Sequence, residues 1–266
     1  MPMNNRILRP LARPLLLDAV PGAAAAYSLR QLSNAYTGPV VTVRRSSDDA
    51  EEDFKASEID DGTLAAFCGA GDGLVKTWHD QSGNGEDATQ LTNNNQPILV
   101  DNGVLLLQDG NPAISFNGTS NRFSTSIDLG TANSWFVIAE PSSTSNAYLI
   151  RSNGSAGSPA LLSGFSSLAF EFYTSAERET LLSTGSGLTA LCVIQEDGGM
   201  LFGTQNGAQA FSTTSSLSGT DSLQITFVGS SGTANFFSGS MTEIILYTKN
   251  MYSQHQRVTG DQMWYY

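Results

Sequence analysis

The sequence has few charged residues and no long hydrophobic run. Only 14% of its 266 residues are Asp, Glu, Lys or Arg, and 25 acidic side chains outnumber 13 basic ones, which gives a formal net charge of −12. At long range this charge repels phosphate backbones and anionic lipid headgroups, so we expect no nucleic-acid partner. No stretch approaches the roughly 18 apolar residues of a membrane span or forms the core of a secretory signal, so we expect a soluble chain without a standard export signal.

Cysteine and histidine are scarce as well. Cys68 and Cys192 are far apart and lie in apolar settings, which favours buried thiols over a disulfide. His79 and His255 have no Cys or His neighbours at metal-ligand spacing, so we expect no metal site, and no motif indicates a cofactor. A glycine-rich stretch at residues 69–73 lacks the Gly-Lys step of a phosphate-binding loop, and we interpret it as a turn.

Gly, Ser, Thr and Asn are abundant instead, and they separate short apolar runs. The expected strands cover residues 74–79, 113–116, 135–140, 147–150, 168–173, 189–195, 200–204, 223–228 and 236–247. Side chains alternate in residues 169–174, as they do in strands with one buried face. Residues 196–199 and the Asn206-Gly207 pair are typical of hairpin turns. The pattern predicts an all-β sandwich.

The N-terminal segment differs in composition from the remainder. Residues 1–20 are expected to form an extended basic, Pro-rich arm, and residues 21–266 a single domain. The first 14 residues contain Arg6, Arg9 and Arg13 but no acid, and their prolines disfavour a packed helix. The arm is either a disordered tail, which we prefer for an isolated monomer, or a strap that orders against an acidic subunit.

Short helices are predicted near both ends of the domain. Residues 23–32 place apolar side chains at helical spacing behind a Pro-Gly pair. A last helix that carries Val258 and Trp264 is expected, with Ser253 as its cap. Between them, residues 48–61 contain eight acids and one Lys. Because these acids lack the glycine spacing of a calcium loop, we expect a solvated loop.

The most specific string is residues 78–86, Trp-His-Asp-Gln-Ser-Gly-Asn-Gly-Glu. Trp78 could stack on a sugar ring while Asp80 and Asn84 orient its hydroxyl groups, a combination that carbohydrate sites use. The alternative is structural: Trp78 fills the core at a strand end, and the two polar side chains bind turn amides. From the residues alone we prefer the structural interpretation.

Four segments together resemble the N-terminal half of the catalytic domain of family 54 glycoside hydrolases, the fungal-type α-L-arabinofuranosidases. They are residues 26–32, 36–39, 43–48 and 78–85. The opening, residues 15–30, also resembles a module of phage structural proteins. Both belong to the concanavalin A-like proteins. The resemblance therefore implies an all-β, concanavalin A-like jelly-roll β-sandwich with a short N-terminal helix and a C-terminal helix.

The same resemblance gives expectations about catalysis. A retaining glycosidase needs a nucleophilic carboxylate and an acid/base carboxyl about 5 Å apart. The family's nucleophile, a Glu on an inner strand, matches Glu171. Its acid lies in a Gly-Gly-Asp-Asn loop, where residues 228–232 here are Val-Gly-Ser-Ser-Gly, and its adjacent cysteine pair is absent around residues 146–152. One carboxylate cannot both attack and protonate, so we expect no such activity and treat Glu171 as an outward strand residue.

Three functional hypotheses follow. The preferred one is a non-enzymatic structural component of a tailed phage virion, a tail-fibre, receptor-binding or head-decoration protein. It would be assembled in the host cytoplasm, attach to other virion proteins through its arm and form a homo-oligomer. The second is a glycoside hydrolase, an arabinofuranosidase or capsule depolymerase, with Asp221 or Glu243 as proton donor. The third adds recognition of host surface carbohydrate to the virion role, through Trp78, Asp80, Asn84 and Glu171.

Overall fold

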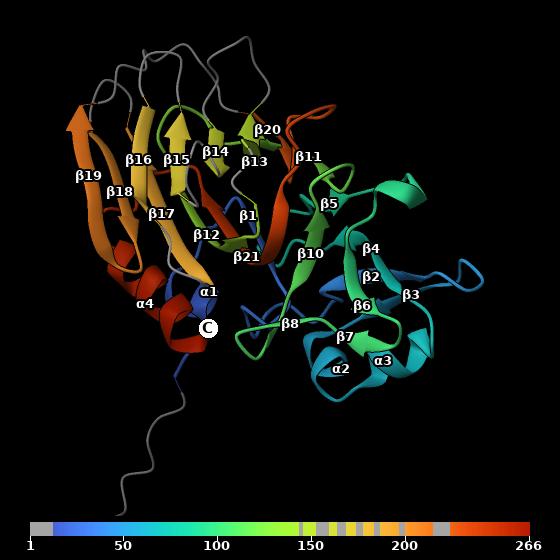
Figure 1. The fold of residues 1–266 in the computed structure, drawn as a ribbon. Coiled ribbons are helices and arrows are strands. Elements are labelled where there is room, and N and C mark those ends of the chain that lie inside the picture. Colours follow the sequence, from blue (N-terminus) through green and yellow to red (C-terminus); the bar gives the residue numbers. More distant parts are fainter. Residues whose placement is uncertain are drawn as a thin grey trace, which may run out of the picture.

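The strands form one continuous hydrogen-bonded network that folds into two packed antiparallel layers (Figure 1). The computed structural model describes residues 13–143, 146–152, 160–163, 169–173, 178–183, 187–196, 200–214 and 224–266. In the first layer β21 (Ser238–Tyr247) pairs on one side with β1 (Ala25–Ser28) and β10 (Ile114–Asn117), and on the other with β12 (Asn133–Pro141). The layer continues through β17 (Thr189–Gln195) and β18 (Met200–Gln205) to β19 (Ala208–Thr214).

The second layer lies over the first. Its strands are, in spatial order, β11 (Phe123–Asp128), β20 (Gln224–Val228), β13 (Ala147–Ser152), β14 (Ala160–Ser163), β15 (Ala169–Tyr173) and β16 (Arg178–Ser183). Each neighbouring pair is antiparallel, which is the arrangement that the alternating apolar runs predict.

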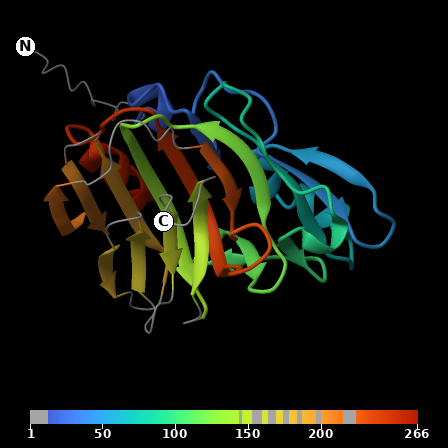
Figure 2. The same ribbon diagram turned by 90° about the horizontal axis from the view of Figure 1, so that it is seen from above.

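A smaller sheet extends from one end of the two layers (Figure 2). Its strands are β2 (Val41–Arg45), β3 (Glu51–Phe54), β4 (Gly73–Trp78), β6 (Ile98–Asp101) and β7 (Val104–Leu105), and β5 (Ala88–Thr89) joins β4 to β11. The short elements beside it are α2 (Ala56–Asp60), α3 (Thr63–Cys68), η1 (Asn93–Asn95) and the pair β8 (Leu107–Gln108) and β9 (Asn111–Pro112). Since β6 also pairs with β10, this sheet is joined to both layers.

The main core lies between the layers. Trp135 on β12 packs edge-to-face against Phe172 on β15, with 5.4 Å between the ring centroids. Phe116, Phe123 and Phe237 form a second aromatic group nearer the small sheet. Each large apolar side chain buried in this way contributes about 1.5–3 kcal/mol, so these interlayer contacts are a main source of stability.

The first layer is buried on its outer face as well. Along β21, Ile244 and Leu246 belong to the interlayer core, whereas Ile245 and Tyr247 point the other way. Two helices cover this outer face, α1 (Leu16–Ala19) and the C-terminal α4 (His255–Tyr265) (Figure 1). The hydrophobic run of β21 therefore has no solvated side, which explains why it reads as a continuous apolar segment.

A buried ion-pair network fixes α4 to the first layer. Glu243 on β21 accepts hydrogen bonds from Nε and Nη2 of Arg30, at 2.8 and 3.1 Å, and from Ser28 Oγ at 2.9 Å. Arg30 Nη2 also donates to Asp261 on α4 at 2.7 Å, and the guanidinium lies 4.5 Å from the centroid of the Tyr265 ring. Each charge in this network therefore has a partner of opposite sign, as burial requires.

The N-terminal predictions need correction. Residues 23–32 were expected to be a helix, but they contain β1, whose four residues are all buried. Pairing with β21 outweighs the helix propensity of the alanines, because Ala25 contacts the interlayer core and Ala26 the outer one. The short N-terminal helix is α1, which lies within the range assigned to the arm. Its Leu16 and Leu17 are buried.

The acidic segment at residues 48–61 is also more ordered than expected. It contains β3 and α2, because Phe54 and Ile59 are buried in the part of the hydrophobic core that the small sheet covers and hold their neighbours in place. The acids of this segment mostly face solvent.

The strand, turn and cysteine predictions are confirmed. Strands occupy the expected apolar runs, and Asn206 and Gly207 have φ values of 48° and 74°, as a tight hairpin turn requires. Residues 197–199 of the other expected hairpin lie outside the described residues. The last helix is present, but it begins at His255 with Gln254 at its N-cap and no side-chain cap, so the cap predicted at Ser253 is wrong. Both cysteines are buried free thiols, and burial raises the pKa of Cys68 to about 11. In the described part of the chain, no helix is long and apolar enough to span a membrane.

We predict that Arg30→Gln lowers the free energy of unfolding by about 3–5 kcal/mol, because it leaves Glu243 buried without a counter-charge. Urea unfolding measures the change. Lys76→Gln is the control, since the pair between Lys76 and Glu51 is partly exposed and contributes no more than about 1 kcal/mol. Equal losses in the two variants would contradict the role assigned to the network.

Candidate functional site

Trp78 does not present a surface to a ligand. Its side chain is fully buried, with ring centroids 5.7 Å from Tyr27 and 6.2 Å from Phe123. A sugar cannot stack on a ring that is enclosed by other side chains. The carbohydrate role considered for Trp78 is therefore corrected: this residue fills the core at the end of β4.

Asp80 and Asn84 hold the loop after β4 against β1. Asp80 accepts the backbone N–H of Ala26 and of Ser82, both at 2.8 Å, and also the Ser82 hydroxyl at 2.7 Å. The Asn84 amide donates to the carbonyl oxygens of Ala23 and Ala24. These side chains are engaged in the turn, as the structural interpretation expected, and they do not form a sugar site with Trp78.

Glu171 lies on the outer face of the second layer. Its neighbours Phe170 and Phe172 point into the interlayer core, so the alternation of β15 directs the carboxylate to the opposite face. Only 7% of Glu171 is exposed, and its cross-strand neighbour Leu162 is buried as well. The carboxylate is therefore part of a sheet face rather than of a mobile loop.

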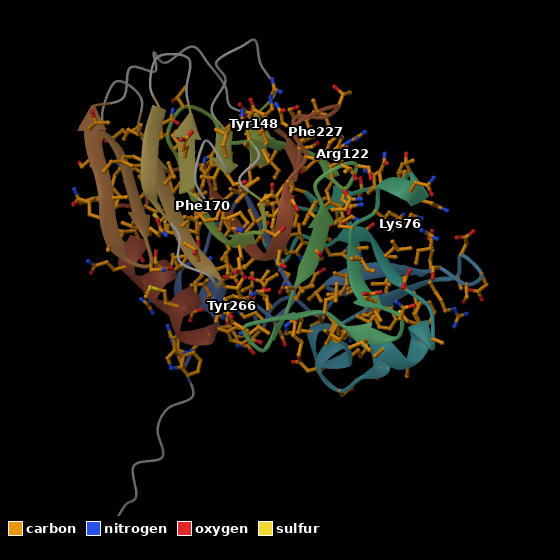
Figure 3. The ribbon with its side chains drawn as sticks, viewed as in Figure 1. Lys76, Arg122, Tyr148, Phe170, Phe227 and Tyr266 are labelled. Carbon is orange, nitrogen blue, oxygen red and sulfur yellow. The ribbon has the colours of Figure 1, made fainter. Side chains whose placement is uncertain are left out.

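Two arginines and three aromatic residues lie on the same face, and we call them the arginine–aromatic platform: Arg122, Tyr148, Arg151, Phe227 and Phe236. All five are half-buried. The Arg151 guanidinium is 5.2 Å from the Tyr148 ring centroid, and that of Arg122 is 5.9 Å from the Phe236 ring centroid. Figure 3 shows Tyr148, Phe227 and Arg122 near one another, at the end of the second layer that adjoins the small sheet.

The loop at residues 229–237 contributes Phe236 to the platform and contacts Arg151 and Phe227. Arg151 Nη1 is 3.4 Å from the Ser231 carbonyl oxygen, and Ser230 Oγ accepts the N–H of Gly232 at 2.9 Å. Gly232 has a φ of +102°, and a Cβ there would lie 2.9 Å from the Phe227 ring, so only glycine fits over this aromatic side chain. The loop carries hydroxyl and amide groups but no acid.

A polar cavity of about 180 Å³ borders the platform at Phe236. Asn117, Ser163 and Ser238 contribute hydrogen-bonding groups to its lining. An aromatic edge beside such groups is a combination that suits a ligand with both C–H and hydroxyl surfaces.

The structure separates Glu243 from Glu171. Glu243 lies on the outer face of the first layer, fully buried beneath α4 and paired with Arg30, whereas Glu171 lies on the outer face of the second layer. Because packed sheets are about 10 Å apart, these carboxyl groups cannot act on one bond. The proposal of Glu243 as the proton donor is therefore corrected. Asp221 lies outside the described residues.

The basic arm is described only in part. Arg6 and Arg9 lie outside the described residues. Arg13 Nη2 is 2.9 Å from Asp261 Oδ1, and its guanidinium is 5.0 Å from the Trp264 ring centroid. This arginine therefore contacts the chain's own C-terminal helix.

Sequence reasoning missed a polar cluster in the small sheet and the whole platform. His79 Nδ1 is 3.1 Å from Asp87 Oδ2, and Nε2 is 2.8 Å from Thr42 Oγ1; the hydrogen bond from His79 lowers the pKa of Asp87. Among the described residues, no three His, Cys, Asp or Glu side chains form a metal-binding group. No sequence motif indicates the platform, because its residues come from four separate segments that only strand pairing brings together.

The layers and their connections define the class of protein as a concanavalin A-like jelly-roll β-sandwich. The family model "Alpha-L-arabinofuranosidase B, catalytic" matches residues 17–144. No curated protein matches the chain. Two solved structures have the same fold: a family 54 α-L-arabinofuranosidase soaked with a cyclic sulfate inhibitor (TM-score 0.73, 16% identity) and an arabinofuranosidase complexed with arabinofuranosyl-α-1,2-xylobiose (TM-score 0.73, 15% identity).

Each of these matches covers 93% of this chain and 64% of the other, so the chain spans less than two thirds of the structures it resembles. At such identities the similarity establishes the fold. The chain is thus a concanavalin A-like module that resembles the catalytic domain of family 54 α-L-arabinofuranosidases. The fold class expected from the sequence is confirmed.

We predict that Trp78→Ala lowers the free energy of unfolding by about 3–5 kcal/mol, because it opens a large cavity among buried aromatic rings. Trp264→Ala is the matched control: 72% of Trp264 is exposed, so its loss is expected to cost no more than about 1 kcal/mol. Thermal and urea unfolding measure both variants. A stable Trp78→Ala protein that loses glycan binding would instead restore the ligand-stacking role.

Proposed function

We propose that this chain is a non-enzymatic carbohydrate-recognition module of a tailed phage virion, and that it binds glycans on the outer face of its second layer. The observation that carries the proposal is the arginine–aromatic platform, half-buried beside a polar cavity and on the same face as Glu171. Aromatic rings cover the apolar faces of sugars, while charged and amide groups bind their hydroxyls.

The absence of hydrolysis is supported by the chemistry of the loop next to the platform. A retaining mechanism needs a proton donor about 5 Å from the nucleophile. Residues 229–237 offer serine, threonine and asparagine, and the charged side chain that contacts this loop at Ser231 is Arg151, which does not donate a proton at physiological pH.

A glycoside hydrolase is the second candidate. It is favoured by one observation: Glu171 is a nearly buried carboxylate on a strand of a fold that family 54 arabinofuranosidases share. Burial in a sheet face is a setting in which a carboxylate can be held in a fixed orientation toward a substrate. The two candidates differ in turnover, and the same substitution tests both.

We predict binding without turnover. The full chain should bind host surface oligosaccharides in isothermal titration calorimetry, and 4-nitrophenyl α-L-arabinofuranoside should be released no faster than in buffer. Tyr148→Ala should weaken binding roughly 2- to 10-fold by removing an aromatic contact. Tyr252→Ala is the control, because Tyr252 is exposed beside α4 on the first layer.

Turnover by the wild-type chain that disappears in Glu171→Gln would replace this proposal with the hydrolase. Retention of glycan binding in Glu171→Gln, with no turnover in either protein, is the expected outcome. Failure of the wild-type chain to bind any host glycan would remove the recognition role.

The virion role is supported by the resemblance of residues 15–30 to phage structural modules and by the basic composition of the arm. Arg13 forms an ion pair with Asp261 on α4, next to the exposed ring of Trp264. This ion pair fixes the point at which the arm joins the module. We propose that the arm attaches the module to other virion proteins and that several copies assemble symmetrically.

Immunoblots of density-purified particles of the encoding phage are expected to contain the chain in a fixed ratio to the major capsid protein. A variant that lacks residues 1–12 should fold, since the described core begins later, but should be depleted from particles. Absence of the wild-type chain from purified particles would contradict the virion role.

A further inference from the structure

We propose that the arginine–aromatic platform selects acidic saccharides, and that Arg122 and Arg151 bind the carboxylates of their uronic acid residues. This inference rests on the glycan recognition proposed above and adds the chemical class of the ligand. Three independent features support it: the charge balance of the two arginines, their position on the sheet, and the groups around them.

The first feature is the lack of counter-charges. Arg13, Arg30, Arg44 and Arg45 each form an ion pair with an Asp or Glu. Among the described residues, neither Arg122 nor Arg151 has a carboxylate partner, although acids outnumber bases by 25 to 13 in the chain. Within the described ranges, these two positive charges thus share one face of the sheet without a neighbouring carboxylate partner.

Arg122 also has a buried hydrogen-bond donor that is unpaired in the described part of the chain. Its Nε atom is buried and has no acceptor among the residues that the structure describes, while its guanidinium lies over the Phe236 ring. A buried donor without a partner is costly, and a carboxylate is the acceptor that best matches a guanidinium. Within the described part of the chain, Arg151 donates one of its five N–H groups to the Ser231 carbonyl, so other donors face the ligand proposed here.

The second feature is the register of the strands. Phe227 on β20 lies directly opposite Arg151 on β13 and opposite Ser124 on β11. Arg122 precedes Ser124 by two residues and so shares its face of the sheet. The two arginines therefore lie on opposite sides of β20: Arg151 is directly opposite Phe227, and Arg122 lies two residues before the position opposite Phe227 on β11. Their backbones are separated by two strand spacings, about 10 Å, and by an offset of two residues along the strands.

The third feature distinguishes a saccharide from a simple anion. Tyr148, Phe227 and Phe236 supply apolar surface between and beside the two charges, and the polar cavity at Phe236 supplies amide and hydroxyl groups. Inorganic anions need only the donors, whereas a sugar ring uses the aromatic faces and the hydroxyl partners as well. Glu171 is two strands from Arg151, which favours an orientation with ligand carboxylates toward the arginines.

The experiment compares three probes on the full chain by isothermal titration calorimetry: a galacturonic acid trimer, a neutral galactose trimer and inorganic sulfate. We expect the acidic trimer to bind about 10- to 100-fold more tightly than the neutral one, the range of one or two charge-assisted hydrogen bonds. Raising the salt concentration should weaken the acidic trimer more than the neutral one.

Variants assign the effect to residues. Arg122→Gln and Arg151→Gln should each reduce the affinity for the acidic trimer by about 10-fold or more and leave the neutral trimer within about 2-fold. Arg257→Gln is the matched control, since this arginine is exposed on α4 on the other side of the sandwich. Arg151→Lys should retain part of the preference, and melting curves establish that each variant is folded.

The outcomes separate this inference from the proposal on which it rests. Equal binding of both trimers, unchanged in the arginine variants, would overturn acidic selectivity and leave glycan recognition standing. No binding of either trimer or of host glycans would remove both. Sulfate binding as tight as that of the acidic trimer, with the same dependence on arginine, would reduce the site to one for simple anions and overturn the saccharide assignment.

Discussion

The buried contact between Arg30 and Glu243 is the constraint on which the arrangement of the termini depends. Glu243 lies in the middle of β21, the strand that joins β1, β10 and β12, and its charge cannot remain buried without a partner. Arg30 supplies that partner and, by reaching Asp261, commits α4 to the outer face of the first layer. Arg13 then extends the same network to the start of the described chain. A strand, a helix and the N-terminal segment are thus fixed by one set of charges.

This arrangement decides which surface is left for function. The central strands of the first layer are buried on both sides, by the interlayer core on one and by α1 and α4 on the other. The small sheet closes one end of the sandwich through its pairings with both layers. The outer face of the second layer remains, and there the side chains alternate between core residues such as Phe172 and outward residues such as Arg151 and Glu171. The platform is consequently where the fold permits a ligand to meet several strands at once.

The sequence was sufficient to predict the fold class and most strands, because period-two alternation and Asn-Gly turns are local signals. It failed at residues 23–32, where alanines favour a helix in isolation but the pairing of β1 with β21, distant in the chain, decides the conformation. It also left open the role of Trp78, since a tryptophan beside polar residues is compatible with both a core and a sugar site. Only its enclosure by Tyr27 and Phe123 settles that question.

The platform could not be predicted for a related reason. Phe227 and Arg151 are distant in sequence and meet because β20 pairs with β13, so neither segment carries a recognisable motif. The resemblance to glycosidases predicts an acid near residues 228–232, where this chain has none. The charged side chain that contacts the Ser231 carbonyl in this loop is the cation Arg151. A fold that holds a carboxylate at Glu171, Arg151 two strands away and Arg122 beyond it presents a charge-separated surface. Such a surface discriminates ligands by where their charges lie, and this requires no bond to be broken.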